Sequence, residues 1–363
     1  MLILLDANIA EAAGELSEHE VECLDDLLLC HSKLYHYVGA PKRVASALIE
    51  KLGARLTKRS LQTLGLISGQ SSDLAAIIRS SNFYVIVRRS EIVGATHHVQ
   101  DSQNTWICDL QYAAKWFSQP STLIGENLID TKVLKVAAAD MASEIGISRN
   151  MQRLNCEMSG GCGNAWEVLK NRIESALCPV LCIIDSDKYS PFHAITPAVE
   201  KCHKVISDMN GISSFFEIEQ REIENLLPDV LLSGAISMLP NSPDRDSIEL
   251  KYNMLMDVRK KFPIIYRHVD IKEGTCCTWA NRKNVYEFFK PVGVVDKCEC
   301  QKDCDGLISP ALFKDVLTKA VEFADSKSFA QLQKLLKNEE RTAWLGLGQI
   351  VMSFSFANGI RVI

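Results

Sequence analysis

The sequence predicts an α/β protein built around a parallel, doubly wound sheet. From Pro120 onward, short apolar runs alternate with segments whose apolar residues recur at helical spacing, which is typical of parallel sheets. The run at 178–184 is apolar apart from one proline near its start, as expected for a strand buried on both faces. Three of the predicted strands end in acidic residues. Because open parallel sheets bind ligands outside the carboxyl ends of their strands, we expect the functional site there.

The length and composition indicate a multidomain globular protein. A chain of 363 residues suggests two or three domains, and 47% hydrophobic with 23% charged residues is ordinary for globular proteins. We expect a helix-rich α/β domain at 1–118, the parallel-sheet domain at 119–232 and a mostly helical region at 233–363. No apolar run is long enough to cross a bilayer and no secretion signal is evident, so we expect a cytoplasmic protein without a membrane partner. Its thirteen cysteines should then be reduced thiols.

Residues 1–118 begin with a short strand that ends at Asp6. Ser17 and Glu20 have the spacing of a capping box for the first long helix, and a second helix should begin at Pro41 and end at Gly53. Helical patterns at 72–80 and 104–117 flank a β-like run at 83–87. In the second pattern, the apolar residues that share one face are Trp106, Leu110, Ala113 and Phe117.

The opening Leu-Leu-Asp-Ala-Asn is similar to the start of PIN-type ribonuclease domains, with Glu50 as a second acid. A strand that ends in Asp is also common in α/β folds without that activity.

A basic stretch in this first domain is a candidate nucleic-acid contact. The net charge of −5 argues against binding over the whole surface, but a local patch could follow a phosphate backbone. The alternative is a solvated helix face. The basic residues are Lys42, Arg43, Lys51, Arg55, Lys58 and Arg59.

The central domain should contain four strands with helices between them. We expect strands at 121–125, 151–158, 178–184 and 214–220, and helices at 127–145, 165–177 and 196–209. A glycine loop at 160–163 follows the second strand, and it lacks the Lys-Ser/Thr ending of a nucleotide P-loop.

Acidic residues follow the first, third and fourth of these strands. Glu126 and Asp130 are four apart, and would face the same way across a first helical turn that starts near Asn127. Asp185 and Asp187 follow the buried strand, and the fourth strand leads into Arg221–Asn225, which contains Glu222 and Glu224. Carboxylates that gather at one sheet edge suit a hard divalent cation.

These motifs resemble a Toprim domain, in particular the nuclease branch of the overcoming-lysogenization-defect family and related phage-defence proteins. The matching elements are Glu126 with Asp130, Asp185 with Asp187, and the run from Arg221 to Asn225. The resemblance covers about 121–228. It departs after Lys188, where residues 189–196 replace a turn that usually contains glycine.

The resemblance implies a Mg²⁺- or Mn²⁺-dependent endonuclease that acts in antiviral defence. Asp185 and Asp187 would bind one ion, Glu126 and Asp130 would hold or complete the other, and Glu222 or Glu224 would supply the last ligand. Lys188 would contact a phosphate or balance the charge of the aspartates. The substrate would be DNA or RNA, and a protein partner or a homo-oligomer in a defence complex is a further expectation.

Two other functions remain open from the sequence. Asp-x-Asp after a buried strand also occurs in HAD-like phosphohydrolases, where Asp185 would be the covalent nucleophile. The second alternative is a non-catalytic subunit that keeps the Toprim fold and binds a partner.

The region after Pro228 reads as helical, with packing helices expected at 311–325, 329–337 and 341–354. Cys298, Cys300 and Cys304 are spaced as in some zinc sites but lack a Cys-x2-Cys pair. Either a structural Zn²⁺ or free thiols fit this pattern.

Overall fold

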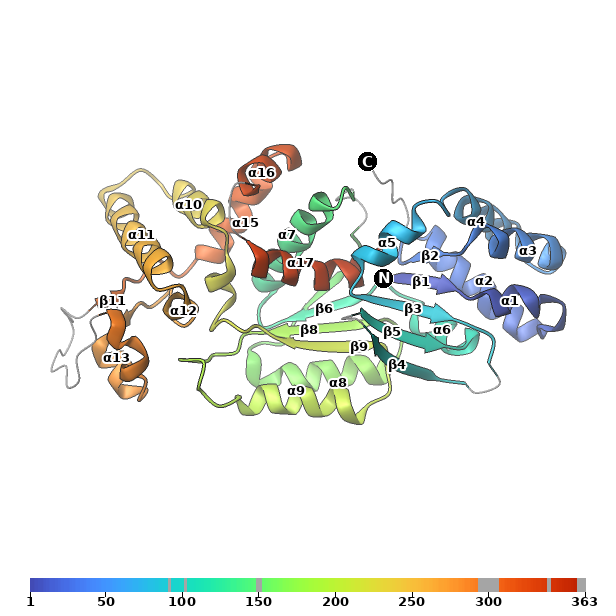
Figure 1. Ribbon diagram of the computed structural model, residues 1–363, viewed down its shortest axis with the longest axis horizontal. Coiled ribbons are helices and arrows are strands. Elements are labelled where there is room, and N and C mark those ends of the chain that lie inside the picture. Colours follow the sequence, from blue (N-terminus) through green and yellow to red (C-terminus); the bar gives the residue numbers. More distant parts are fainter. Residues whose placement is uncertain (91–92, 101–102, 148–151, 293–306, 338–340, 358–363) are drawn as a thin grey trace.

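The computed structural model describes residues 1–90, 93–100, 103–147, 152–292, 307–337 and 341–357. It is an α/β structure with two sheets dominated by parallel strands, placed side by side (Figure 1). Buried side chains from all three predicted regions, between Met1 and Phe356, form one connected hydrophobic core. Among the described residues, no helix is long and apolar enough to span a membrane.

The first part of the chain forms a five-stranded sheet in the order β2-β1-β3-β5-β4. All pairs are parallel except β4 with β5, which form a hairpin. Its elements are β1 (Leu2–Leu5), α1 (Ala7–Glu11), α2 (Glu18–Ser32), β2 (Tyr37–Gly39), α3 (Lys42–Leu52), α4 (Lys58–Gly69), α5 (Leu74–Ser80), β3 (Phe83–Val87), β4 (Ala95–Gln100), β5 (Gln103–Cys108) and α6 (Leu110–Trp116), with a 3-10 turn at Ala13–Glu15.

The predicted helix at 104–117 is wrong in its first half. Residues Gln103–Cys108 form β5, and the helix α6 begins only after Asp109, whose carboxylate accepts hydrogen bonds from the N–H groups of Gln111 and Tyr112. The apparent helical face combined Trp106 of the strand with residues of α6. The prediction also missed β4, because its side chains are almost all exposed and carry no apolar alternation.

The two acids of the PIN-like comparison, Asp6 and Glu50, lie in different environments. Asp6 caps α1 by accepting a hydrogen bond from the Asn8 N–H at 2.9 Å. Glu50 is exposed on α3.

The central sheet has four parallel strands in the order β7-β6-β8-β9. In Figure 1, α7 lies on one face of this sheet, and α8 and α9 lie on the other. Each strand is shorter than predicted, but the alternation is the predicted one. The elements are β6 (Thr122–Gly125), α7 (Leu128–Glu144), β7 (Asn155–Met158), a 3-10 turn (Cys162–Asn164), α8 (Ala165–Ser175), β8 (Val180–Ile184), α9 (Pro197–Asp208), β9 (Ser213–Glu217) and a 3-10 turn, η4 (Ile223–Leu226).

The last part of the chain is mostly helical, with one short antiparallel pair formed by β10 and β11. Its elements are α10 (Asp229–Ser237), α11 (Pro243–Lys261), α12 (Pro263–Tyr266), β10 (Thr275–Cys276), α13 (Cys277–Arg282), α14 (Tyr286–Phe289), a 3-10 turn (Lys290–Val292), β11 (Leu307–Ser309), α15 (Val316–Ser326), α16 (Phe329–Leu336) and α17 (Thr342–Ser355).

Helix α17 returns to the middle of the molecule and packs along α7 (Figure 1). Arg341 donates to both carboxylate oxygens of Asp140 at 3.0 and 2.8 Å, and the Trp344 indole N–H donates to the same carboxylate at 3.1 Å. At the other end of α17, the Ser353 hydroxyl accepts a hydrogen bond from the Asn82 N–H, next to β3. The final helix therefore ties the two sheets together.

We predict that Gly348→Ala destabilises the protein by about 1–2 kcal/mol, because it overpacks the contact between α17 and α7. A Cβ at Gly348 would lie 2.3 Å from the backbone oxygen of Ala137, which cannot move as a side chain can. Gly346→Ala is the matched control on the same helix, since a Cβ there meets nothing within 4 Å. It should stabilise the protein by ~0.5–1 kcal/mol through helix propensity. Urea unfolding of the two variants checks the sign of each effect, and equal shifts would contradict the packing.

Candidate metal centre

Strand order places two of the predicted acids at the point where the central sheet reverses its winding. The chain passes from β6 outward to β7 and then returns to β8 on the other side of β6. In sheets of this kind, ligands bind where the strand order reverses. Glu126 follows β6 and Asp185 follows β8, so both lie at this point.

Backbone hydrogen bonds hold Glu126 in place. Its Oε1 accepts a hydrogen bond from the Asp185 N–H at 3.1 Å, which joins the two strand ends directly. Its backbone oxygen accepts from the N–H groups of Gly160 and Gly161 at 3.2 and 3.3 Å. These glycines have φ values of +74° and +111°, a region that side chains with a Cβ rarely adopt. The glycine loop therefore fixes the end of β7 against the end of β6.

One tight group of ligand atoms consists of Glu126, Asp187 and Cys162, whose oxygen and sulfur atoms all lie within 4.8 Å of one another. Asp187 adopts a left-handed conformation with φ +54°, and its N–H donates to the Arg221 backbone oxygen at 3.0 Å. Burial, together with Glu126 and Asp187, raises the pKa of the Cys162 thiol to about 11. Cys162 therefore stays a neutral thiol beside the two carboxylates.

A second group surrounds Lys272. The Lys272 Nζ lies 3.0 Å from Glu224 Oε1 and 3.4 Å from Glu222 Oε2. Burial acts to lower the pKa of Lys272, but Glu224 and Glu222 outweigh it and the pKa is raised. Asp185 and Asp130 also act electrostatically on this group.

Crowding and burial disfavour the ionised form of these acids. The pKa of Glu126 is raised to about 7, mainly by burial and next by the charge of Asp187. The pKa of Glu222 is also raised to about 7, mainly by burial and next by the charge of Glu224. The pKa of Asp185 is raised well above its usual value by burial, and next by Glu224 and Glu126. Burial likewise raises the pKa of Glu224 and of Asp130. The site concentrates more negative charge than its own cations balance, and an added cation would relieve this.

The donor atoms fit a hard divalent cation. Glu224 Oε2 is buried and accepts no hydrogen bond from the residues that the structure describes. Glu222 Oε2 is also buried and lacks a well-aligned donor among these residues, although the Lys272 ammonium lies 3.4 Å away. Oxygen donors of this kind suit Mg²⁺ or Mn²⁺, whereas a neutral thiol such as Cys162 is a poor ligand for either ion. Glu126 and Asp187, whose ligand oxygens lie within 4.8 Å of each other, could hold one such ion. Asp185 and Glu224, which act electrostatically on each other, could complete the site.

The grouping differs from the pairs that the sequence suggested. Asp187 lies with Glu126, while Asp185 turns inward, where its Oδ1 accepts from the Ile223 N–H at 2.9 Å. Helix α7 begins at Leu128 with Asn127 as its N-cap, close to the predicted start, and Asp130 Oδ2 accepts from the Asn127 N–H at 2.8 Å. Asp130 thus caps the helix and faces the group around Lys272. Glu222 and Glu224, which a regular helix would separate, both reach Lys272 because Glu222 is an extended residue before η4.

Three of the predicted basic contacts have partners within the protein, and the other four are exposed. Lys188 Nζ pairs with Glu217 Oε1 at 2.8 Å, and not with the neighbouring aspartates whose charge it was expected to balance. Arg55 pairs with Glu18 at 2.8 Å, and Lys51 donates to the Ala10 backbone oxygen at 2.9 Å. The remaining four residues of the stretch are exposed: Lys42, Arg43, Lys58 and Arg59. The zinc interpretation concerns Cys298, Cys300 and Cys304, which lie outside the described residues.

Sequence reasoning missed Cys162 and Lys272. Cys162 lies in the glycine loop after β7, where the glycines were the visible signal. Lys272 follows Asp270, a buried acid that pairs with Arg221 at 2.7 Å, but no local pattern connects this segment with the sheet edge.

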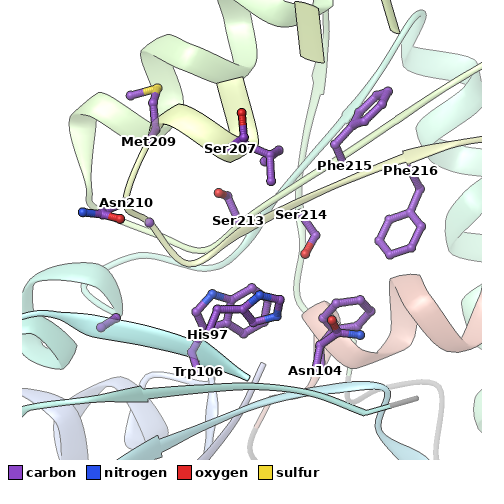
Figure 2. A pocket seen from close by; sticks show the side chains of 14 residues that line it. His97, Asn104, Trp106, Ser207, Met209, Asn210, Ser213, Ser214, Phe215 and Phe216 are labelled. Carbon is purple, nitrogen blue, oxygen red and sulfur yellow. The ribbon is translucent and has the colours of Figure 1, made fainter. Parts of the chain in front are cut away.

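A cavity of about 340 Å³ lies between the two sheets and is distinct from the acidic edge (Figure 2). The rings of His97 and Trp106 stack there with centroids 4.8 Å apart, facing Ser213 and Ser214 at the amino end of β9. None of the described residues that line it carries a carboxylate. The described lining therefore does not form a set of ligands for a hard cation.

Comparison of the chain with protein-family models, with curated proteins and with solved structures finds no match.

Proposed function

We propose that the protein is a metal-dependent nuclease that hydrolyses phosphodiester bonds of nucleic acid, with a Toprim-like central domain. The observation that carries this proposal is the gathering of Glu126, Asp185, Asp187, Glu222 and Glu224 where the sheet reverses its winding. The antiviral setting, and a partner or homo-oligomer within it, rest on the sequence resemblance alone.

Hydrolysis of a phosphodiester bond requires positive charge beside the phosphate and a correctly positioned water molecule. A bound Mg²⁺ or Mn²⁺ would supply Lewis-acid stabilisation of the phosphate and lower the pKa of a water ligand. The protein's own part is positioning. The Asp185 N–H and the glycine loop fix Glu126, and the Arg221 backbone fixes Asp187. Lys272 keeps Glu222 and Glu224 together and adds a positive charge at the inner side of the site.

The test is a cleavage assay with purified full-length protein. Supercoiled plasmid, linear duplex DNA, single-stranded DNA and RNA are incubated with Mg²⁺, Mn²⁺ or EDTA, and small phosphate monoesters are assayed in parallel. We expect cleavage of at least one nucleic acid that depends on the divalent ion. Turnover of the monoesters with a covalent aspartyl-phosphate would instead support a HAD-like phosphohydrolase. No activity on any substrate would support a non-catalytic subunit.

We predict that Glu224→Gln lowers the cleavage rate by about 10²-fold or more, and that Glu222→Gln costs about 10-fold or less. Glu224 is the carboxylate that acts most strongly on Asp185, and its Oε2 is a buried acceptor without a hydrogen-bond donor among the described residues. Glu222 has a second cation nearby, Arg221 at 3.6 Å. Rates of the two variants at saturating Mn²⁺ check the order. Equal losses in two folded variants would contradict it.

A further inference from the structure

A second cavity, of about 480 Å³, opens beside the segment that carries Glu222 and Glu224. It lies between the end of β9, the α11–α12 corner and the start of α17. The polar side chains that matter for its chemistry are those of Gln220, Arg259, Lys260, Tyr266, Arg267 and Arg341. Among the described residues, no Asp or Glu lines it.

The lining carries positive charge that the acidic residues in the described part of the chain leave partly unbalanced. Arg341 is neutralised by Asp140 and Glu144, at 2.8 and 2.9 Å. Within the described part of the chain, by contrast, no ion pair engages Arg259, Lys260 or Arg267. Their neighbour Lys261 does pair, with Asp257 at 3.1 Å. Three uncompensated cations around one cavity define a site for an anion.

Some of the donors are held in place before any ligand arrives. The Arg259 guanidinium lies 5.1 Å from the Tyr266 ring centroid and donates to the Leu227 backbone oxygen at 3.0 Å. Tyr266 is only 3% exposed, yet its hydroxyl makes no well-aligned hydrogen bond within the described residues. A buried hydroxyl without such a partner, next to a fixed guanidinium, matches an oxyanion that can accept from both.

Three hydrogen bonds connect this cavity with the acidic edge. The Arg267 backbone oxygen accepts from the Arg221 N–H at 2.8 Å, and the next residue, His268, donates from Nδ1 to the Lys188 backbone oxygen at 2.9 Å. The Gln220 backbone oxygen accepts from the hydroxyl of Ser186, between Asp185 and Asp187, at 2.8 Å. The cavity is thus next to the candidate metal centre.

We propose that this cavity binds a backbone phosphate of the nucleic-acid strand whose neighbouring linkage lies at the metal centre. The proposal rests on the proposed nuclease function. It says on which side of the metal centre the strand continues. Arginine is suited to this role because its planar donors can grip two phosphate oxygens at once. Several uncompensated cations favour a polymer with repeated charges over a single small anion.

The test measures strand binding in EDTA, so that no cleavage occurs. Full-length wild type, the double variant Lys260→Gln/Arg267→Gln and the control Lys261→Gln/Lys314→Gln are titrated against a labelled 20-nucleotide DNA and RNA by fluorescence anisotropy. Each is measured over a range of salt concentrations. Both double variants remove two charges, but Lys261 and Lys314 are exposed outside the cavity.

We expect the cavity variant to bind about 10-fold more weakly than wild type, and the slope of log K against log salt to shrink by about 1.4, as for two lost contacts with a single strand. The control should keep the wild-type slope. Equal effects of the two variants, or no strand binding by wild type, would overturn the proposal. The proposal would also be overturned if inorganic phosphate or a mononucleotide displaced the labelled strand as strongly as the unlabelled strand does.

This outcome is separable from the nuclease proposal. Wild type that binds a strand through the cavity but cleaves nothing with Mn²⁺ would refute the nuclease alone. Cleavage by a protein whose cavity variant binds like wild type would refute the cavity alone.

Discussion

Asp185→Asn is expected to reduce divalent-dependent cleavage by about 10³-fold or more, a loss of ~4 kcal/mol of transition-state stabilisation. The amide keeps an oxygen that can accept from the Ile223 N–H, so the local fold should persist. Without a metal, the variant should be as stable as wild type or more stable by about 1 kcal/mol. Burial, Glu224 and Glu126 raise the pKa of Asp185, which means that its charge weakens the metal-free fold.

The stability readout separates a metal ligand from a structural residue. Mn²⁺ at about 100 times its Kd should stabilise wild type by ~2.7 kcal/mol, and clearly less in the variant. Asp208→Asn, the same change at an exposed residue at the end of α9, should behave as wild type. A variant that unfolds more easily without metal, or one that cleaves normally, would be inconsistent with the assigned role.

Lys272→Met should lower the free energy of unfolding of the metal-free protein by about 3 kcal/mol. The change leaves Glu222 and Glu224 buried without the cation that both contact. The expected loss of stability is at the low end of the range for buried ion pairs, because Lys272 is one third exposed. Mn²⁺ should then stabilise the variant more than it stabilises wild type, because the ion no longer competes with the ammonium group for these carboxylates.

Thermal and urea unfolding with and without Mn²⁺ measure both the loss of stability in the metal-free variant and its stabilisation by Mn²⁺. Lys314→Met, which breaks an exposed pair of 3.6 Å with Glu273, is the matched control and should change stability by less than about 1 kcal/mol. Equal Mn²⁺ stabilisation of wild type and Lys272→Met would show that Lys272 lies outside the field of the bound ion.

The alternation of the central sheet could be predicted because its signals are local. The apolar run Val180–Ile184 is buried along its whole length, and Asp185 follows it directly in the sequence. The winding of the chain then carries Glu126 to the same place. The β4–β5 hairpin escaped prediction for the opposite reason. Its outer strand is polar and exposed, so only its pairing with β5 reveals it.

The composition of the site was predictable in type but not in arrangement. Acidic motifs identified Glu126, Asp185, Asp187, Glu222 and Glu224, whereas their division into two groups depends on backbone bonds to Arg221 and Ile223. Lys272 comes from a distant segment that has no motif. The return of α17 onto α7 likewise depends on tertiary contacts such as that between Arg341 and Asp140.

The most direct test of the central claim compares metal occupancy with cleavage in the same wild-type preparation. Mn²⁺ is titrated into metal-free protein, with bound ion followed by electron paramagnetic resonance and strand cleavage followed on the nucleic acid that is cut. We expect saturable binding of one or two ions and a cleavage rate that rises in parallel with occupancy. Cleavage that proceeds in EDTA, or ions that bind without any nucleic acid being cut, would contradict a metal-dependent nuclease.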